Sequence, residues 1–188
     1  MSKQVAIVYH SGYGHTKRQA EAVAAGVAEV AGVEVALYPV EALGDAEWAR
    51  LDAADALIFG APTYMGSASA KFKEFMEASS GRWYQRAWQD KLAAGFTCSA
   101  SQNGDKLNTL IEMFLFAQQH AMLWLGLGLL PGNNSSQGSL DDLNRLGSFA
   151  GAMAQANADQ GAEAMRESDL KTAAALGRRV AERVARSA

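Results

Sequence analysis

Short apolar runs alternate along the chain with segments in which apolar residues recur every three or four positions. The first run, Val5-Ala6-Ile7-Val8-Tyr9, is apolar and rich in β-branched residues, which is typical of a strand covered on both faces. Similar runs predict strands over residues 33–37, 56–59, 91–98 and 122–126. Helical spacing predicts helices between His15 and Gly32 and over residues 46–51, 69–78, 104–120 and 169–186. This alternation predicts an α/β fold, a doubly wound five-stranded parallel sheet with helices on both faces.

The segment between the fifth predicted strand and the last helix is the least regular part of the sequence. Residues 127–147 are rich in Gly, Asn and Ser and predict an irregular excursion, either a flexible loop or a functional cap. Residues 150–158 fit a helix or an extended segment equally well. Ser168 is expected to cap the N-terminus of the last helix. With 188 residues, the chain 1–188 is expected to fold as a single domain.

Composition and charge narrow the classes of function. The chain is 49% hydrophobic and 20% charged, which argues against disorder, and its net charge of −3 argues against a nucleic-acid partner. The single cysteine, Cys98, excludes an internal disulfide framework, and the three histidines show no metal-ligand spacing, so no metal is expected. The N-terminus lacks a signal-peptide layout, and no apolar run approaches the roughly 20 residues of a membrane span. We therefore expect a cytoplasmic protein with no membrane partner.

The loop after the first predicted strand carries the first candidate chemistry, because ligands of doubly wound sheets bind beyond the carboxyl ends of the strands. In residues 11–16, two glycines and two hydroxyl residues directly precede a helix. Glycine allows a tight turn with exposed amides, and the helix N-terminus adds free N–H groups and partial positive charge. The segment matches neither GxxxxGK[ST] nor GxGxxG. It predicts a phosphate monoester site; the alternative is an ordinary glycine-rich turn capped by Thr16.

The loops after the third and fourth predicted strands carry groups suited to a flat polar ring. Residues 60–67 pair the rigid Pro62 with Tyr64, whose ring could stack on a ligand. Residues 97–105 are mostly small and polar, so this loop could wrap an edge that carries both carbonyl and N–H groups. The alternatives are that Tyr64 covers the core and that the second loop is only solvated. A phosphate cradle beside two such loops predicts flavin mononucleotide (FMN), which the doubly wound flavodoxins bind at the same place.

In the order of these motifs the sequence resembles the WrbA-type family of flavodoxin-like NAD(P)H:quinone oxidoreductases. The family motifs S-x-x-G-H-T, F-G-x-P-T-x-x-G-x-x-S, a tryptophan, K-L-A-x-x-F-x-x-S and H-G-M correspond here to residues 11–16, 59–69, Trp83, 91–99 and 120–122. The match runs in order over about residues 4–126 and resumes weakly toward the C-terminus. The resemblance implies the flavodoxin-like strand order 2-1-3-4-5.

The resemblance also implies the site residues. Those expected to bind FMN are Ser11, Gly12, Tyr13, Gly14, His15 and Thr16 around the phosphate, Pro62, Thr63, Tyr64, Met65 and Gly66 along the isoalloxazine, and Ser99, Ala100, Ser101, Gln102, Asn103, Gly104 and Asp105 around its far edge. Trp83 and His120 would flank the open flavin face as catalytic residues; alternatively Trp83 is a hydrophobic anchor and His120 a histidine at a helix C-terminus. The family's glycine-rich run is replaced by residues 100–103, and the Gly of H-G-M is Ala121, which puts the family's substrate access in doubt.

The leading functional expectation is a flavoenzyme in which NADH or NADPH gives a hydride to FMN and the reduced flavin passes two electrons to a quinone. The alternatives are a flavodoxin-type one-electron carrier, which would usually be more acidic, an NAD(P)H-dependent FMN reductase, and an adaptor protein. A homo-dimer or homo-tetramer with composite active sites is expected, because a single helix face cannot bury Phe114, Leu115 and Phe116 together and aromatic residues left on a surface tend to mark contact sites. The aromatic segments in question are residues 83–88 and 114–116.

Overall fold

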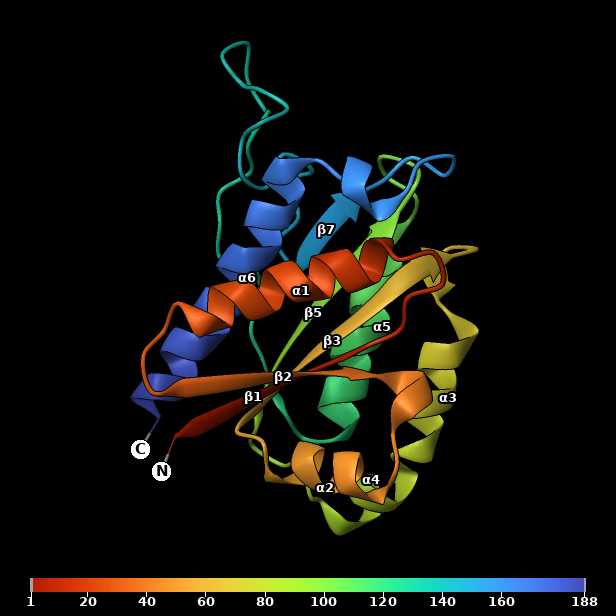
Figure 1. Ribbon diagram of the computed structural model, residues 1–188, viewed down its shortest axis with the longest axis vertical. Helices are drawn as coiled ribbons and strands as arrows, with labels where there is room; N and C mark the ends of the chain where they lie inside the picture. Colours follow the sequence, from red (N-terminus) through yellow and green to blue (C-terminus); the bar gives the residue numbers. More distant parts are fainter. Residues whose placement is uncertain (1, 188) are drawn as a thin grey trace.

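A parallel sheet ordered β2-β1-β3-β5-β6 forms the centre of the computed structural model, which describes residues 2–187 (Figure 1). Its strands are β1 (Lys3–Tyr9), β2 (Val33–Pro39), β3 (Ala56–Tyr64), β5 (Leu92–Ser99) and β6 (Leu123–Trp124). All neighbouring pairs along this path are parallel. The predicted doubly wound sheet and its strand order 2-1-3-4-5 are confirmed.

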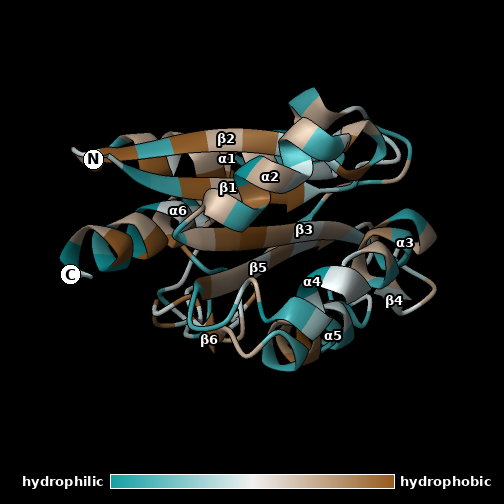
Figure 2. Ribbon diagram, turned by 90° about the horizontal axis from the view of Figure 1, so that it is seen from below, coloured by the Kyte–Doolittle hydropathy of each residue, from teal (hydrophilic) through white to brown (hydrophobic). Residues whose placement is uncertain are grey.

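Helices cover both faces of the sheet. They are α1 (His15–Ala28), α2 (Asp45–Ala53), α3 (Ala70–Ala78), α4 (Ser80–Gln85), α5 (Lys106–Gln119) and α6 (Glu167–Arg186), with short 3-10 turns η1 (Val40–Ala42) and η2 (Ala162–Ala164). Val23 of α1 and Val180 of α6 pack in one core with Ile7 of β1. Phe72 of α3 and Met113 of α5 pack in the other core with the opposite face of the sheet. Figure 2 shows the apolar strands between these helix layers.

The fifth strand of the sheet is built from two separate pieces. Strand β6 pairs only with Leu92 and Ala93 at the start of β5. Strand β7 (Ala152–Gln155) pairs with residues 96–99 at its end, so it completes the same edge from a segment far along the chain. The predicted strand 122–126 is therefore too long, and the undecided segment 150–158 is extended. Residues 127–147, which lie between the two pieces, contain no helix or strand.

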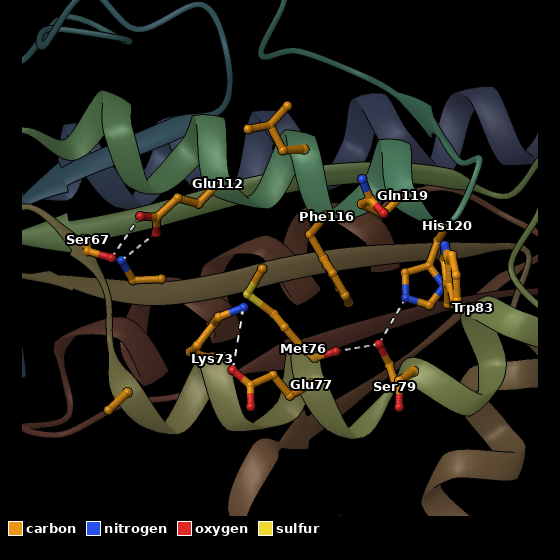
Figure 3. A pocket seen from close by; sticks show the side chains of 14 residues that line it. Ser67, Lys73, Met76, Glu77, Ser79, Trp83, Glu112, Phe116, Gln119 and His120 are labelled. Carbon is orange, nitrogen blue, oxygen red and sulfur yellow. Dashed lines mark hydrogen bonds and ion pairs between the residues drawn. The ribbon is translucent and has the colours of Figure 1, made fainter.

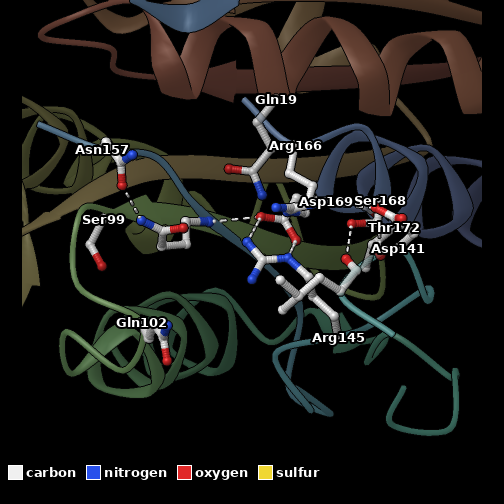
Figure 4. Close-up of polar contacts among 12 residues, drawn as sticks. Gln19, Ser99, Gln102, Asp141, Arg145, Asn157, Arg166, Ser168, Asp169 and Thr172 are labelled. Carbon is white, nitrogen blue, oxygen red and sulfur yellow. Dashed lines mark hydrogen bonds and ion pairs between the residues drawn. The ribbon is translucent and has the colours of Figure 1, made fainter. Parts of the chain in front are cut away.

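Buried polar contacts fasten this insertion to α6 (Figure 4). Arg145 donates two hydrogen bonds to the carboxylate of Asp169, at 2.8 and 2.7 Å, and Asp169 also accepts the N–H of Gln155 at 3.0 Å. Ser168 does not cap α6 as predicted, since the helix begins at Glu167 with Arg166 as its N-cap residue, and the Ser168 hydroxyl donates to the Leu140 carbonyl. The Ser168 side chain therefore holds residues 127–147 against α6 instead of capping the helix.

The aromatic residues that suggested an oligomer divide between core and surface. Trp88 and Phe116 are 0% and 6% exposed and contact each other edge to face, so both belong to the core. Tyr84 and Leu115 are exposed at 83% and 55%. Phe116 is therefore largely buried, and Leu115 is the exposed residue of segment 114–116. Among residues 2–187, none of the helices combines the length and apolar character needed to cross a bilayer.

Candidate cofactor-binding site

A cavity of about 780 Å³ opens at the carboxyl ends of β1, β3 and β5, within the size range of small-molecule pockets. The predicted site residues that line it are Tyr13, His15, Thr16, Pro62, Thr63, Tyr64, Met65, Gly66, Ser99, Ala100, Ser101, Gly104 and Asp105. The predicted residues Ser11, Gly12, Gly14, Gln102 and Asn103 belong to the same loops but do not line the cavity. Three loops that are distant in sequence are thus brought together around one space.

The first loop presents unpaired donors at the start of α1. Gly14 is the N-cap residue and has a φ of 91°, a left-handed conformation that glycine adopts without strain. Within the described residues, the amides of residues 12–16 have no main-chain acceptor, as expected at a helix N-terminus. The Ser11 hydroxyl accepts the N–H of Lys17 at 3.0 Å, which leaves its own hydrogen free to donate. Thr16 is 2% exposed and lines the cavity. These groups form a cradle suited to a phosphate.

The second loop is a tight hairpin held by α5. Strand β4 (Ser67–Ala68) pairs with the end of β3, and the two residues between them, Met65 and Gly66, have φ angles of 50° and 80°. Such a pair of positive φ angles is the geometry of a two-residue hairpin turn. The Glu112 carboxylate accepts the Ser67 hydroxyl and the Ala68 N–H, both at 2.8 Å. The turn therefore projects the fully exposed Met65 side chain at the cavity's edge from a rigid base.

Hydroxyl groups and a thiol lie beneath the cavity. The Thr63 hydroxyl is 2.8 Å from the hydroxyls of both Thr97 and Thr109, which links β3, β5 and α5. Cys98 is 4% exposed, and burial raises the pKa of its thiol to about 12. The thiol is therefore neutral near pH 7, and Cys98 has the character of a buried small residue, as the sequence suggested.

The segment after β7 completes the wall and was missed from the sequence. Ala156 and Ala158 line the cavity, and the His15 ring nitrogen Nε2 donates to the Gln160 carbonyl at 2.8 Å. Small residues in an irregular segment give no local signal of a site. They reach the cavity only because β7 pairs with the end of β5.

Trp83 and His120 line a different cavity, of about 640 Å³, between α3, α4 and α5 (Figure 3). His120 is 4% exposed, and its Nε2 atom is 2.9 Å from the Ser79 hydroxyl. Since that hydroxyl donates to the Met76 carbonyl, Nε2 carries the hydrogen and Nδ1 is a buried acceptor without a partner in residues 2–187. Burial lowers the pKa of His120 to about 4, so the ring is neutral at pH 7. Within a single chain, therefore, neither Trp83 nor His120 lines the first cavity.

Comparison with known proteins agrees with this geometry. Residues 5–124 match the family model described as NADPH-dependent FMN reductase. A protein of Pseudomonas aeruginosa named "Flavodoxin FldP" is 46% identical over 184 residues, covering 96% of each chain. A Geobacter sulfurreducens protein named "NAD(P)H dehydrogenase (quinone)" is 35% identical over 199 residues, covering 95% of this chain and 96% of that one.

A solved structure supports the same assignment of the fold. The flavodoxin, WrbA-like protein from Agrobacterium tumefaciens is 44% identical and superposes with a TM-score of 0.78, covering 98% of both chains. Coverage at this level extends the likeness beyond the three loops to the insertion and α6.

Proposed function

The chain belongs to the WrbA-type family of flavodoxin-like NAD(P)H:quinone oxidoreductases, and from this premise we propose that it is an FMN-dependent enzyme that transfers a hydride from NADH or NADPH to the flavin and two electrons on to a quinone. The observation that carries the proposal is the convergence of three loops on one cavity, with unpaired amides at the N-terminus of α1. When bound there, FMN would supply the redox chemistry.

The chain's own residues would bind and orient the cofactor. The amides of residues 12–16 and the hydroxyls of Ser11 and Thr16 would hold the phosphate. The hairpin carrying Tyr64 and Met65 would bound one side of the ring, with residues 99–105 at its far edge. No covalent nucleophile is required, and the neutral thiol of Cys98 takes no part.

A shared flavin face has a kinetic consequence. If nicotinamide and quinone occupy the same face in turn, the first product must leave before the second substrate enters. Steady-state rates of NADH or NADPH oxidation with benzoquinone should then give parallel double-reciprocal lines, the pattern of a ping-pong mechanism. Intersecting lines would contradict the shared face, and no turnover by the FMN-loaded protein with either nucleotide would contradict the proposed enzyme.

Two other functions have support from the comparisons. The relative named flavodoxin favours a one-electron carrier, and the matched family model favours an FMN reductase that releases reduced flavin. A carrier would oxidise NAD(P)H slowly with or without quinone. A reductase would respond to free FMN more strongly than to quinone. Rates of NAD(P)H oxidation with quinone, with excess FMN and with neither therefore separate the three. A cytoplasmic location stays a prediction.

The proposed role of Trp83 and His120 depends on assembly. Since one chain places them in the second cavity, they could act on a bound flavin only if a neighbouring copy brought this surface to the first cavity. The exposed Trp83 and Leu115 at the second cavity's rim fit an interface in the predicted homo-dimer or homo-tetramer.

Replacing Leu115 by glutamate should lower assembly and quinone turnover together, because a charge would enter the apolar interface. FMN affinity should be unchanged, since Leu115 is outside the first cavity. Leu107→Glu is the matched control: Leu107 lies on the same helix with 54% exposure against 55%, but away from the second cavity. Light scattering at micromolar concentration reports the assembly. A fully active 20 kDa wild-type species would contradict the predicted oligomer.

A further inference from the structure

Lys106, the first residue of α5, is completely buried directly behind the third loop of the site. Its Nζ atom donates to the Ser99 hydroxyl at 2.9 Å and to the carbonyls of Ser101 and Gln102 at 2.6 and 2.9 Å. An ammonium group has three hydrogens, and here each has an acceptor. Lys106 itself does not line the cavity, so the loop lies between its charge and the ligand space.

These bonds determine which way the loop's peptide groups face. In a trans peptide the N–H points opposite to the carbonyl, so a carbonyl drawn inward to Lys106 turns the next amide outward. The amides of Gln102 and Asn103 consequently face away from Lys106. Within the part of the chain described, the amides of residues 100–104 have no main-chain acceptor. The loop thus offers free donors at Gln102 and Asn103 on the side away from Lys106, between Ser101 and Gly104, which line the cavity.

The conformation of the loop supports this arrangement. Gly104 and Asp105 have φ angles of 55° and 53°, two successive left-handed residues that return the chain to α5. A methyl group at position 104 would overlap the Ser99 hydroxyl oxygen, which is one of the acceptors of Lys106. Glycine at this position therefore leaves room for the bond between Lys106 and Ser99.

Within residues 2–187, the ammonium group of Lys106 makes no direct ion pair. All three acceptors are uncharged oxygen atoms, and the nearby Asp169 carboxylate is engaged by Arg145. Burial lowers the pKa of Lys106 to about 8, which leaves the ammonium mostly protonated at pH 7. A buried cation that makes no direct ion pair favours additional negative charge at the adjacent wall of the cavity.

We propose that Lys106 is a positioning residue that holds the amides of Gln102 and Asn103 outward from the loop, toward a ligand at this wall, and that its charge makes the pocket bind two-electron reduced flavin more tightly than oxidised flavin. The inference rests on the proposed binding of FMN. Reduced flavin carries a negative charge at neutral pH that oxidised flavin lacks, and a protein tunes flavin chemistry through such charges and hydrogen bonds.

The test compares two matched variants, Lys106→Met and Lys91→Met. Lys91 is half-buried, and its Nζ atom donates to the carbonyls of Asp52 and Ala54. It directly precedes β5 and so lies at the amino ends of the strands, away from the cavity. Apoprotein is titrated with oxidised FMN, and the two-electron midpoint potential of the bound flavin is measured. Lys106→Met should weaken binding of reduced FMN at least tenfold more than that of oxidised FMN, which lowers the midpoint potential by about 30 mV or more. Lys91→Met should leave the midpoint potential unchanged.

Other outcomes overturn the inference in distinguishable ways. If Lys106→Met weakened binding of oxidised and reduced FMN equally, the midpoint potential would not change. That result would contradict the proposed effect of the Lys106 charge and leave Lys106 with a packing role. If Lys106→Met does not fold, amide hydrogen exchange of the wild-type protein, measured with and without FMN, tests the proposal instead. FMN should slow exchange at Gln102 and Asn103, and their unaltered exchange with FMN bound would refute the proposal. Wild-type protein that binds no FMN would instead refute the proposed function.

Discussion

Replacing Gly14 by valine should weaken FMN binding at least about a hundredfold. The φ of 91° at Gly14 is strained for any L-residue and most of all for a β-branched one, so valine would change the turn. Turning the loop misdirects the amides that follow it. Hydrogen bonds to charged groups are worth roughly 1.5–3 kcal/mol each, so losing two of them costs about 3–6 kcal/mol. Fluorescence titration of apoprotein with FMN measures the change.

Gly32→Val is the matched control for this prediction. Gly32 has a φ of 80° and, like Gly14, has room for a side chain, but it lies at the other end of α1. Both variants carry similar backbone strain, so both should lose stability, while only Gly14→Val should lose FMN affinity. Thr16→Ala should fall between wild type and Gly14→Val, with a loss of about tenfold. Equal FMN affinities for the two valine variants would contradict the phosphate cradle.

The central strands could be predicted because their burial is visible locally. In β1 and β3 nearly every residue is buried, and such strands are continuous apolar runs in the sequence. Strand β7 could not be predicted in the same way, since Ala152-Met153-Ala154-Gln155 has no β-branched residue. It becomes a strand because β5 offers an unpaired edge beyond β6. Which distant segment fills that edge is decided by the tertiary fold.

The site likewise has parts that the local sequence predicts and parts that depend on distant segments. The loops after β1, β3 and β5 could be predicted because a parallel sheet places the carboxyl ends of neighbouring strands at one edge. The wall formed by Ala156 and Ala158 depends on the placement of β7, and their sequence carries no chemical signal. Lys106 lies within the predicted helix 104–120 and gives no local signal, and the role proposed for it rests on the three oxygens around its Nζ atom.

The contact between α1 and α6 supplies the second large effect, on stability. Gly26 and Gly177 lie inside these helices, where each faces the backbone of the other helix. A methyl group at Gly177 would overlap the Val23 carbonyl oxygen, and one at Gly26 would overlap the Ala174 carbonyl oxygen. The obstacle in both cases is main chain, which cannot rotate away as a side chain can. The helices would have to separate, opening the core that they share with the sheet.

Gly177→Ala should therefore lower the free energy of unfolding by about 3 kcal/mol, a large part of the total for a domain of this size. Intrinsic helix propensity predicts the opposite sign, because alanine is favoured over glycine in a helix by about 1 kcal/mol. Gly81→Ala isolates that propensity, since Gly81 in α4 has open space around it, and should be neutral or slightly stabilising. Urea unfolding of both variants tests the difference. If Gly177→Ala were as stable as Gly81→Ala, the close approach of α1 and α6 would be wrong, and with it the placement of the phosphate cradle that α1 carries.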